Sequence, residues 1–203
     1  TGGSNGNMMG MLCARQASDP MSSITGFDGS KYVAFVSAEA HYSVLMSANV
    51  VGIGYQNLVK VACDSRGRMK PESLVEEIVR ARTNGQTPFC IIATSGTTVR
   101  GAFDPLKEIA NIAHDNNIWL HVDAAWGGSS LFSKRFRKLM DGVELADSVC
   151  WDAHKMMGMP LICSVFLTKS KDTLRAVCAH GDAAHYLFHE DTKEIDLGRY
   201  SLQ

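Results

Sequence analysis

The chain has 203 residues, of which 45% are hydrophobic and 20% charged, and its net charge is -1. This composition is typical of a globular protein with one sizeable core. The near-neutral balance gives no electrostatic reason to expect nucleic acid or an anionic membrane surface as a partner, and no apolar run approaches the roughly 20 residues that span a bilayer.

Helix-period segments alternate with apolar runs of strand length, which is typical of an α/β domain with a mostly parallel sheet flanked by helices. No linker-like stretch divides the chain, so we expect one domain over residues 1–203. In chain order we expect a helix over residues 5–16, a loop over 18–30, a strand over 31–37, a helix over 41–51, a strand over 58–62, a helix from Pro71, a strand over 89–93, a helix from Pro105, and strands over 118–122, 148–151 and 161–167.

The two helices that begin at a proline should each turn an apolar face toward the sheet, because their apolar residues recur at helical spacing. The inward side chains are predicted to be Leu74, Val75, Ile78 and Val79 in the first helix, and Leu106, Ile109, Ala110 and Ala113 in the second.

The ends and the cysteines give two further expectations. We expect a piece of a longer protein, because the chain begins at Thr1 rather than at a methionine and stops at Gln203 without a closing element. The six cysteines show no Cys-x-x-Cys spacing, so neither a disulfide framework nor a metal site is expected. Buried free thiols fit a reducing compartment, and the cytoplasm is the expected location.

Polar residues follow three of the predicted strands. Thr98 comes shortly after one strand, Asp123 ends another, and His154 and Lys155 follow a third. Because ligands of open α/β sheets bind outside the carboxyl ends of the strands, these side chains are predicted to form one site.

Lys155 lies in the segment WDAHKMMG, an apolar setting directly after a strand. Most lysines are solvated surface charges. A lysine in a desolvated pocket has a depressed pKa, however, and its amine can then act as a nucleophile that forms a Schiff base. His154 beside it offers a donor for an anionic group such as phosphate.

Asp123 ends an apolar strand, where a carboxylate is costly unless something cationic meets it. A structural salt bridge or a cap would explain it. The functional interpretation is a partner for a protonated pyridine nitrogen, because that proton makes the ring of pyridoxal phosphate (PLP) an electron sink. Ala124 and Ala125 are small and would let a flat ring approach the strand end.

Two weaker signals complete the set. The glycine-rich turn over residues 2–7 opens a helix whose N-terminus could bind an anion, although a simple cap by Ser4 or Asn5 explains it equally well. His41 is either a structural histidine or one that lies against an aromatic ring and contacts a reacting carboxylate. An anion-binding turn, a stacking histidine, a strand-end aspartate and a strand-end lysine are the parts that a PLP site needs.

The motifs GGSNGN, SAEAHYS, ATSGTTVRGAFDP, WLHVDAAWGG and SVCWDAHKMMG occur in this order along the chain. In this the sequence resembles the group II PLP-dependent decarboxylases, which act on glutamate, cysteine sulfinate, aspartate or aromatic amino acids. The likeness is greater to the glutamate and cysteine sulfinate branch. It implies the large domain of fold type I, decarboxylation of an acidic L-amino acid to the amine and CO2, and a homodimer whose active site lies at the subunit interface.

The resemblance also implies roles for individual residues. Lys155 would carry the cofactor and assist proton transfer, Asp123 would pair with the pyridine nitrogen, and His41 and Ala125 would lie on opposite faces of the ring. Thr98 matches a family threonine close to the ring. The implied phosphate contacts are Asn5, Gly6, His154, Asp152 and Ser148.

The sequence also departs from the family pattern. Gly6 stands where many relatives have a serine, and Asp152-Ala153 replaces a frequent Asn-Pro. An aspartate beside a phosphate is unfavourable unless it is protonated or turned toward a neighbouring donor. Residues 189–198 fall near the family's mobile catalytic loop but lack a tyrosine matching the one that protonates the carbanion in many members; Tyr200 is expected to begin the next strand.

Other functions stay open at this point. The substrate could be diaminobutyrate or an aromatic amino acid. The chain could serve a different reaction on the same fold, namely transamination, aldol cleavage or desulfuration, which would yield a keto acid or sulfide. A non-catalytic PLP-binding or dimer-forming module is a third possibility, against which the retention of Lys155, Asp123, His41 and the glycine-rich turn argues.

Overall fold

One mixed sheet forms the middle of the structure. The computed structural model describes residues 2–178 of the chain. The six strands of the sheet are β1 (Tyr32–Ser37), β2 (Leu58–Val61), β3 (Thr87–Thr94), β4 (Trp119–Asp123), β5 (Ser148–Asp152) and β6 (Ser164–Thr168). Their order is β2-β1-β3-β4-β5-β6; the first five run parallel, and β6 pairs with β5 antiparallel. The predicted mostly parallel α/β fold is confirmed.

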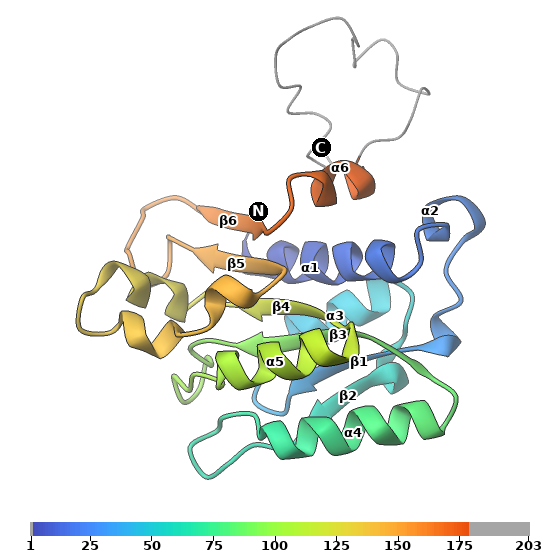
Figure 1. Ribbon diagram of the computed structural model, residues 1–203. Coiled ribbons are helices and arrows are strands. Elements are labelled where there is room, and N and C mark those ends of the chain that lie inside the picture. The colour runs from blue at the N-terminus through green and yellow to red at the C-terminus, as the bar shows by residue number, and fades with distance from the viewer. Residues whose placement is uncertain (1, 179–203) are drawn as a thin grey trace, which may run out of the picture.

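Helices cover both faces of this sheet (Figure 1). None of the described helices is long and apolar enough to cross a membrane. The α-helices of the described residues are α1 (Gly3–Ser18), α2 (Ser22–Thr25), α3 (Ser43–Val50), α4 (Pro71–Thr83), α5 (Leu106–Asn116) and α6 (Asp172–Cys178), and the short 3-10 helices include η1 (Gly29–Lys31) and η3 (Gly127–Phe132).

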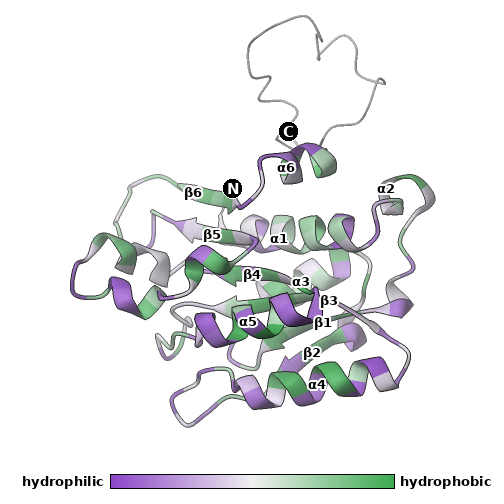
Figure 2. Cartoon of the chain, in the orientation of Figure 1, coloured by the Kyte–Doolittle hydropathy of each residue, from purple (hydrophilic) through white to green (hydrophobic). Residues whose placement is uncertain are grey.

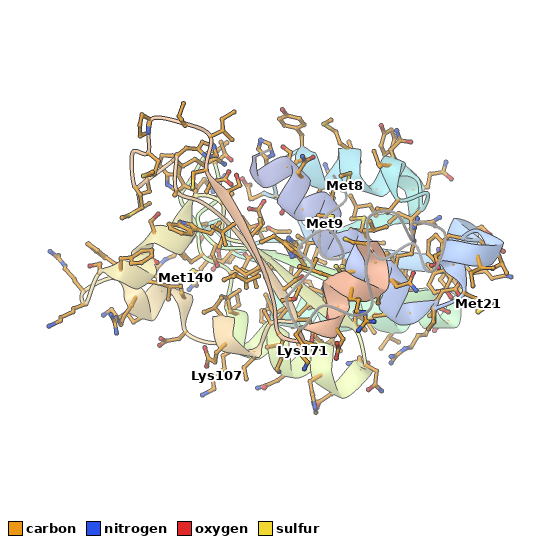
Figure 3. The ribbon with its side chains drawn as sticks, turned by 90° about the horizontal axis from the view of Figure 1, so that it is seen from above. Met8, Met9, Met21, Lys107, Met140 and Lys171 are labelled. Carbon is orange, nitrogen blue, oxygen red and sulfur yellow. The ribbon has the colours of Figure 1, made fainter. Side chains whose placement is uncertain are left out.

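The alternation of side chains along the strands divides the core into two halves. In β3, Ile91 and Ala93 point to the half that α4 and α5 cover, whereas Cys90 and Ile92 point to the half that α1 and α3 cover. Figure 3 shows this division from above, with Lys107 of α5 on one side of the sheet and Met8 and Met9 of α1 on the other.

The amphipathic helices α4 and α5 form largely as their spacing predicts (Figure 2). In α5 the four predicted inward residues are all buried, and in α4 Leu74 and Ile78 are buried. The prediction for Val75 and Val79 is wrong, because these side chains are 44% and 57% exposed. Each follows a buried residue by one position, and a helix turns successive side chains about 100° apart.

The C-terminal strand and the loop over 18–30 also differ from the prediction. The last strand begins at Ser164 rather than at Leu161, and Leu161 and Ile162 are exposed in the preceding loop. Apolar character alone therefore extended the predicted strand too far. The expected loop over 18–30 contains the short helices α2 and η1.

Helix α1 lies close against β4 and β5 because glycines face the sheet. A Cβ atom on Gly6 would come within 2.5 Å of the Cys150 Cβ, and one on Gly10 within 2.4 Å of the His121 Nδ1. No side chain fits in either space. This close packing brings the first turn of α1 over the carboxyl ends of both strands.

Candidate active site

A cavity of about 250 Å³ opens at the carboxyl ends of the central strands, beside the first turn of α1. The sheet register places Thr94 at the end of β3 next to Asp123 at the end of β4. Seven of the predicted site residues line this one cavity, as the location at the strand ends predicts. They are Lys155, Asp123, His41, Ala125, Thr98, Asp152 and His154.

Asp123 presents a buried carboxylate to the cavity. Its Oδ2 accepts a hydrogen bond of 2.8 Å from the Asn7 amide, and its Oδ1 accepts one of 3.1 Å from the Ala125 N–H. The Cys150 sulfur lies 3.6 Å from Oδ1. Among the described residues, no lysine or arginine forms an ion pair with Asp123. Neutral donors thus hold a negative charge that a cationic ring nitrogen could meet.

His41 lies in the turn before α3, and Ser43 fixes its ring. The Nδ1 atom accepts the Ser43 backbone N–H at 3.2 Å and lies 2.9 Å from the Ser43 hydroxyl oxygen. Because Nδ1 accepts, a neutral His41 carries its proton on Nε2.

Lys155 follows β5 and is paired with the carboxylate of Asp152, three residues before it. The Nζ–Oδ2 distance is 3.5 Å, and a third of the lysine side chain is exposed. The predicted desolvated setting is therefore only partly present. His154 also lies close to the Asp152 carboxylate, and its Nε2 is 3.7 Å from Oδ2.

Asp152 is turned toward neighbouring donors, which accounts for an acid at this position. Its Oδ2 accepts the Gly3 N–H at 3.0 Å, and its Oδ1 accepts the Ser164 hydroxyl proton at 2.6 Å. The partial positive charge at the N-terminus of α1 also favours a carboxylate there. Asp152 therefore ties α1 to β5 and β6.

The structure does not bring Asn5 and Gly6, the predicted phosphate contacts, to the cavity. Helix α1 begins at Gly3, two residues earlier than expected, so the N–H groups of Asn5 and Gly6 already bond to the Gly2 carbonyl at 3.1 and 3.4 Å. Neither residue lines the cavity. Gly3 and Ser4 line it in their place.

Ser148 is also misplaced in the prediction. It begins β5, at the opposite end of the strand from the cavity. Its hydroxyl oxygen lies 3.0 Å from the Trp119 Nε1 and 2.9 Å from the His121 Nδ1. The resemblance implied a phosphate contact for Ser148, but the length of β5 separates this residue from the strand end at the cavity.

Asn7 is the main site residue that the sequence did not indicate. It is 3% exposed and bonds to both Asp123 and Ser43. A signal was present, because a polar residue one turn after Gly3 lies on the same helix face as the glycines. Trp126, Gly96 and Thr94 also line the cavity and were not predicted.

The predictions about residues 189–198 and Tyr200 fall outside the described residues. Within the described part of the chain, no group of three or more His, Cys, Asp or Glu side chains is placed to hold a metal ion. All six cysteines are free; Cys63 and Cys163 are partly exposed and the other four are buried.

The fold and the cavity define a protein of the PLP-binding α/β class. The family model of the pyridoxal-dependent decarboxylase conserved domain matches residues 1–203, and the chain belongs to this family. The predicted family and cofactor are thereby confirmed.

Relatives with established names agree with this assignment. The acidic amino acid decarboxylase GADL1 of Homo sapiens is 47% identical over 206 residues, which are 100% of this chain and 39% of that protein. The cysteine sulfinic acid decarboxylase of Mus musculus is 44% identical over 191 residues, which are 94% of this chain and 38% of that protein. The crystal structure of mouse CSAD superposes with a TM-score of 0.91 at 39% identity, over 100% of this chain and 42% of that one. The chain thus spans about two fifths of the length of these relatives.

The cavity suits PLP on structural grounds as well. It combines a buried carboxylate, an imidazole and a primary amine, which are the groups that the ring and its aldehyde require. The Thr94 hydroxyl is buried at its wall and has no hydrogen-bond partner among the described residues. A buried polar atom left unpaired in this way is expected to meet a ligand.

Proposed function

We propose that this chain is the cofactor-binding part of an enzyme that decarboxylates an acidic L-amino acid, releasing CO2 and leaving the amine. The observation that carries the proposal is that Asp123 and Lys155, from two different strand ends, line one cavity. The names of the relatives support acidic substrates, of which glutamate, aspartate and cysteine sulfinate are the candidates.

Each residue then has a role that its position supports. Bound PLP supplies an electron sink for the pair left behind when the carboxylate departs. Asp123 would keep a proton on the ring nitrogen, Lys155 would attach the cofactor through its amine, and Thr98 would lie beside the ring. His41 and Ala125 would orient the ring by packing on its two faces. Holding charge in a preorganised setting of this kind contributes on the order of several kcal/mol to catalysis.

The phosphate group would bind at the first turn of α1. Gly3 and Ser4 line the cavity there, and His154 faces the same region. Asp152 contributes by holding the Gly3 N–H and Lys155 in place rather than by contacting the phosphate. A helix N-terminus is a favourable site for such an anion.

A second copy of the chain is proposed to complete the site. Large apolar side chains are exposed around the segment that follows Lys155 and on α3, which favours burial against a partner. They are Tyr42, Met46, Met156, Met157, Leu161 and Ile162. The six free thiols support a location in the reducing cytoplasm.

The test begins with the attachment of the cofactor. In the PLP-loaded protein, borohydride reduction followed by peptide mass spectrometry should place the added cofactor mass on Lys155, and Lys155→Ala should lose the visible absorbance of the lysine-bound cofactor. An unchanged spectrum in Lys155→Ala would remove this lysine from its role.

The reaction and the substrate need a product assay. Release of CO2 should be fastest from glutamate, aspartate or cysteine sulfinate, and slower from diaminobutyrate or an aromatic amino acid. Formation of a keto acid or sulfide without CO2 would replace decarboxylation by another PLP reaction. A spectrum of bound cofactor without any turnover would indicate a non-catalytic module.

A further inference from the structure

A continuous chain of hydrogen bonds, buried except at its first bond, runs from Trp119 to Asp123 at the wall of the cavity. The Trp119 indole N–H donates to the Ser148 hydroxyl oxygen at 3.0 Å, and this oxygen lies 2.9 Å from the His121 Nδ1. The His121 Nε2 lies 3.1 Å from the Asn7 Oδ1, and the Asn7 amide donates to Asp123 at 2.8 Å. The chain links both ends of β4 through α1 and β5.

The two ends of this chain fix the direction of every bond between them. An indole N–H can only donate, and an ionised carboxylate can only accept. Asn7 therefore turns its amide N–H toward Asp123 and its oxygen toward His121, since the opposite orientation would set its oxygen against the carboxylate. Neutral His121 must then carry its proton on Nε2 and donate it to the Asn7 oxygen, which leaves Nδ1 as an acceptor. Ser148, which accepts from Trp119, gives its own proton to this Nδ1.

Burial keeps the members of the chain in these states. It lowers the pKa of His121 from 6.5 to about 4, so the imidazole is neutral at physiological pH; the nearby carboxylate of Asp123 opposes this shift without cancelling it. Burial also raises the pKa of the Cys150 thiol well above its usual value, so the thiol keeps its proton and donates to the Asn7 Oδ1 at 3.2 Å. Two donors thus converge on the Asn7 oxygen.

The Asn7 amide has a second proton, which points to the other side of the cavity. It is donated to the Ser43 hydroxyl oxygen at 2.8 Å. Ser43 is then left to donate its own proton to the His41 Nδ1, 2.9 Å away. One amide group therefore orients the Asp123 carboxylate and, through Ser43, determines which nitrogen of His41 carries the proton.

We propose that Ser148, His121 and Asn7 are positioning residues that set the proton pattern of the cofactor cavity. Through them Asp123 is held as an oriented carboxylate, and His41 keeps its proton on the Nε2 that remains free. The inference rests on the proposed function, because it concerns the two residues that would hold the cofactor ring.

The structure offers a matched control for one link of the chain. Ser129 is buried, and its hydroxyl accepts the Trp151 indole N–H at 2.9 Å, as Ser148 accepts that of Trp119. In the part of the chain that the structure describes, Ser129 makes no hydrogen bond to Asp123 or Asn7. Ser148→Ala and Ser129→Ala therefore remove the same kind of hydrogen bond, but only the first interrupts the chain.

The experiment measures the binding of PLP to the full protein by absorbance or fluorescence. Ser148→Ala should weaken binding about fivefold, and His121→Phe about tenfold or more, because a buried network loses a member. His121→Gln keeps one donor and one acceptor and should recover most of the affinity. Ser129→Ala should change it less than about twofold.

A second readout separates positioning from simple destabilisation. The pH midpoint at which the ring nitrogen of the bound cofactor loses its proton, followed by absorbance, should fall by about one unit in Ser148→Ala, because Asp123 then holds this proton less firmly. Thermal unfolding of the two serine variants provides the check on folding. Equal cofactor affinities and equal pH midpoints in both variants would overturn the inference.

The outcomes also separate this inference from the proposed function. If the wild-type protein binds PLP but releases no CO2 from any acidic amino acid, the proposed function is refuted. The binding and pH measurements then still test the chain of hydrogen bonds. If the wild-type protein is active while Ser148→Ala and Ser129→Ala have the same cofactor affinity and the same pH midpoint, only the inference is refuted.

Discussion

The two faces of the sheet differ in the kind of side chain that they bury. Under α4 and α5 the core consists of apolar side chains packed at helical spacing, such as Leu74 and Ile109. Under α1 the packing also contains a buried row of polar groups, including Asn7 and His121, that ends at Asp123. Because buried polar groups cost free energy unless they are all paired, such a row is kept where position matters.

This contrast predicts that substitutions on the two faces have separable effects. Changes on the α4–α5 face should lower the free energy of unfolding and leave the affinity for PLP nearly unchanged. Changes on the α1 face should alter the cofactor site at a smaller cost in stability. The expected effects below run from the largest to the smallest.

Asp123→Ala should have the largest effect. Removing the carboxylate leaves the ring nitrogen without a partner, and we expect turnover to fall on the order of 1,000-fold. Asp123→Glu should retain far more activity, because it keeps the negative charge. The measurement is the rate of CO2 release at saturating substrate and cofactor.

A surface aspartate provides the control for this variant. Asp115 is largely exposed at the end of α5, and Asp115→Ala should leave turnover unchanged. If Asp123→Ala and Asp115→Ala behaved alike, Asp123 would have only a structural role.

Ile109→Ala tests the other face. Ile109 is completely buried in the core beneath α5. Its truncation should lower the free energy of unfolding by about 3 kcal/mol, since large-to-small core changes also leave a cavity. Urea unfolding measures this loss, and the PLP affinity of the folded variant should stay within about twofold of wild type. A large loss of affinity would mean that the two faces are coupled.

The pH dependence of the free energy of unfolding should show the lowered pKa of His121. Because burial depresses its pKa to about 4, this residue contributes stability that is present above pH 6.5 and is lost as the pH falls toward 4. The contribution is at most about 3 kcal/mol. Asp104 acts in the opposite direction, since burial raises its pKa to about 6 and its contribution is lost as the pH rises through that value.

Comparing wild type with His121→Gln isolates the histidine from Asp104. Urea midpoints between pH 7 and pH 4.5 should fall more steeply in wild type than in the variant. Parallel curves would show that His121 titrates normally and that the buried chain is not held in one protonation state.

The sequence predicted the α5 side of the molecule better than the α1 side for a physical reason. Apolar residues at a period of 3.6 report directly which helix face is buried, and Leu106 and Ile109 follow this pattern. In the first turns of α1 the buried residues are glycines and Asn7, and larger apolar side chains join the buried face only from Met11 onward. The start of that helix was therefore predicted two residues too late.

Within the site, residues at strand ends were predictable and residues acting at a distance were not. Lys155 and Asp123 come directly after apolar strands, and a ligand site at the carboxyl ends follows from the fold. Asn7 and Asp123 are 116 positions apart in sequence. Only the tertiary packing of α1 on β4 brings them together, so no local pattern could indicate this contact.

Val79→Lys should have the smallest effect on the free energy of unfolding. It tests where the buried apolar face of α4 ends. Val79 is 57% exposed, whereas the adjacent Ile78 is buried. Lysine favours helix more than valine does and suits the last turns of α4, so the free energy of unfolding should change by less than about 0.5 kcal/mol.

Ile78→Lys is the matched comparison, because it places the same charge one residue earlier. It should cost about 4 kcal/mol or prevent folding, since the ammonium group would enter the core without a partner. Thermal unfolding of both variants measures the difference. A strong destabilisation by Val79→Lys would mean that the apolar face extends to Val79 and that the described exposure of this side chain is wrong.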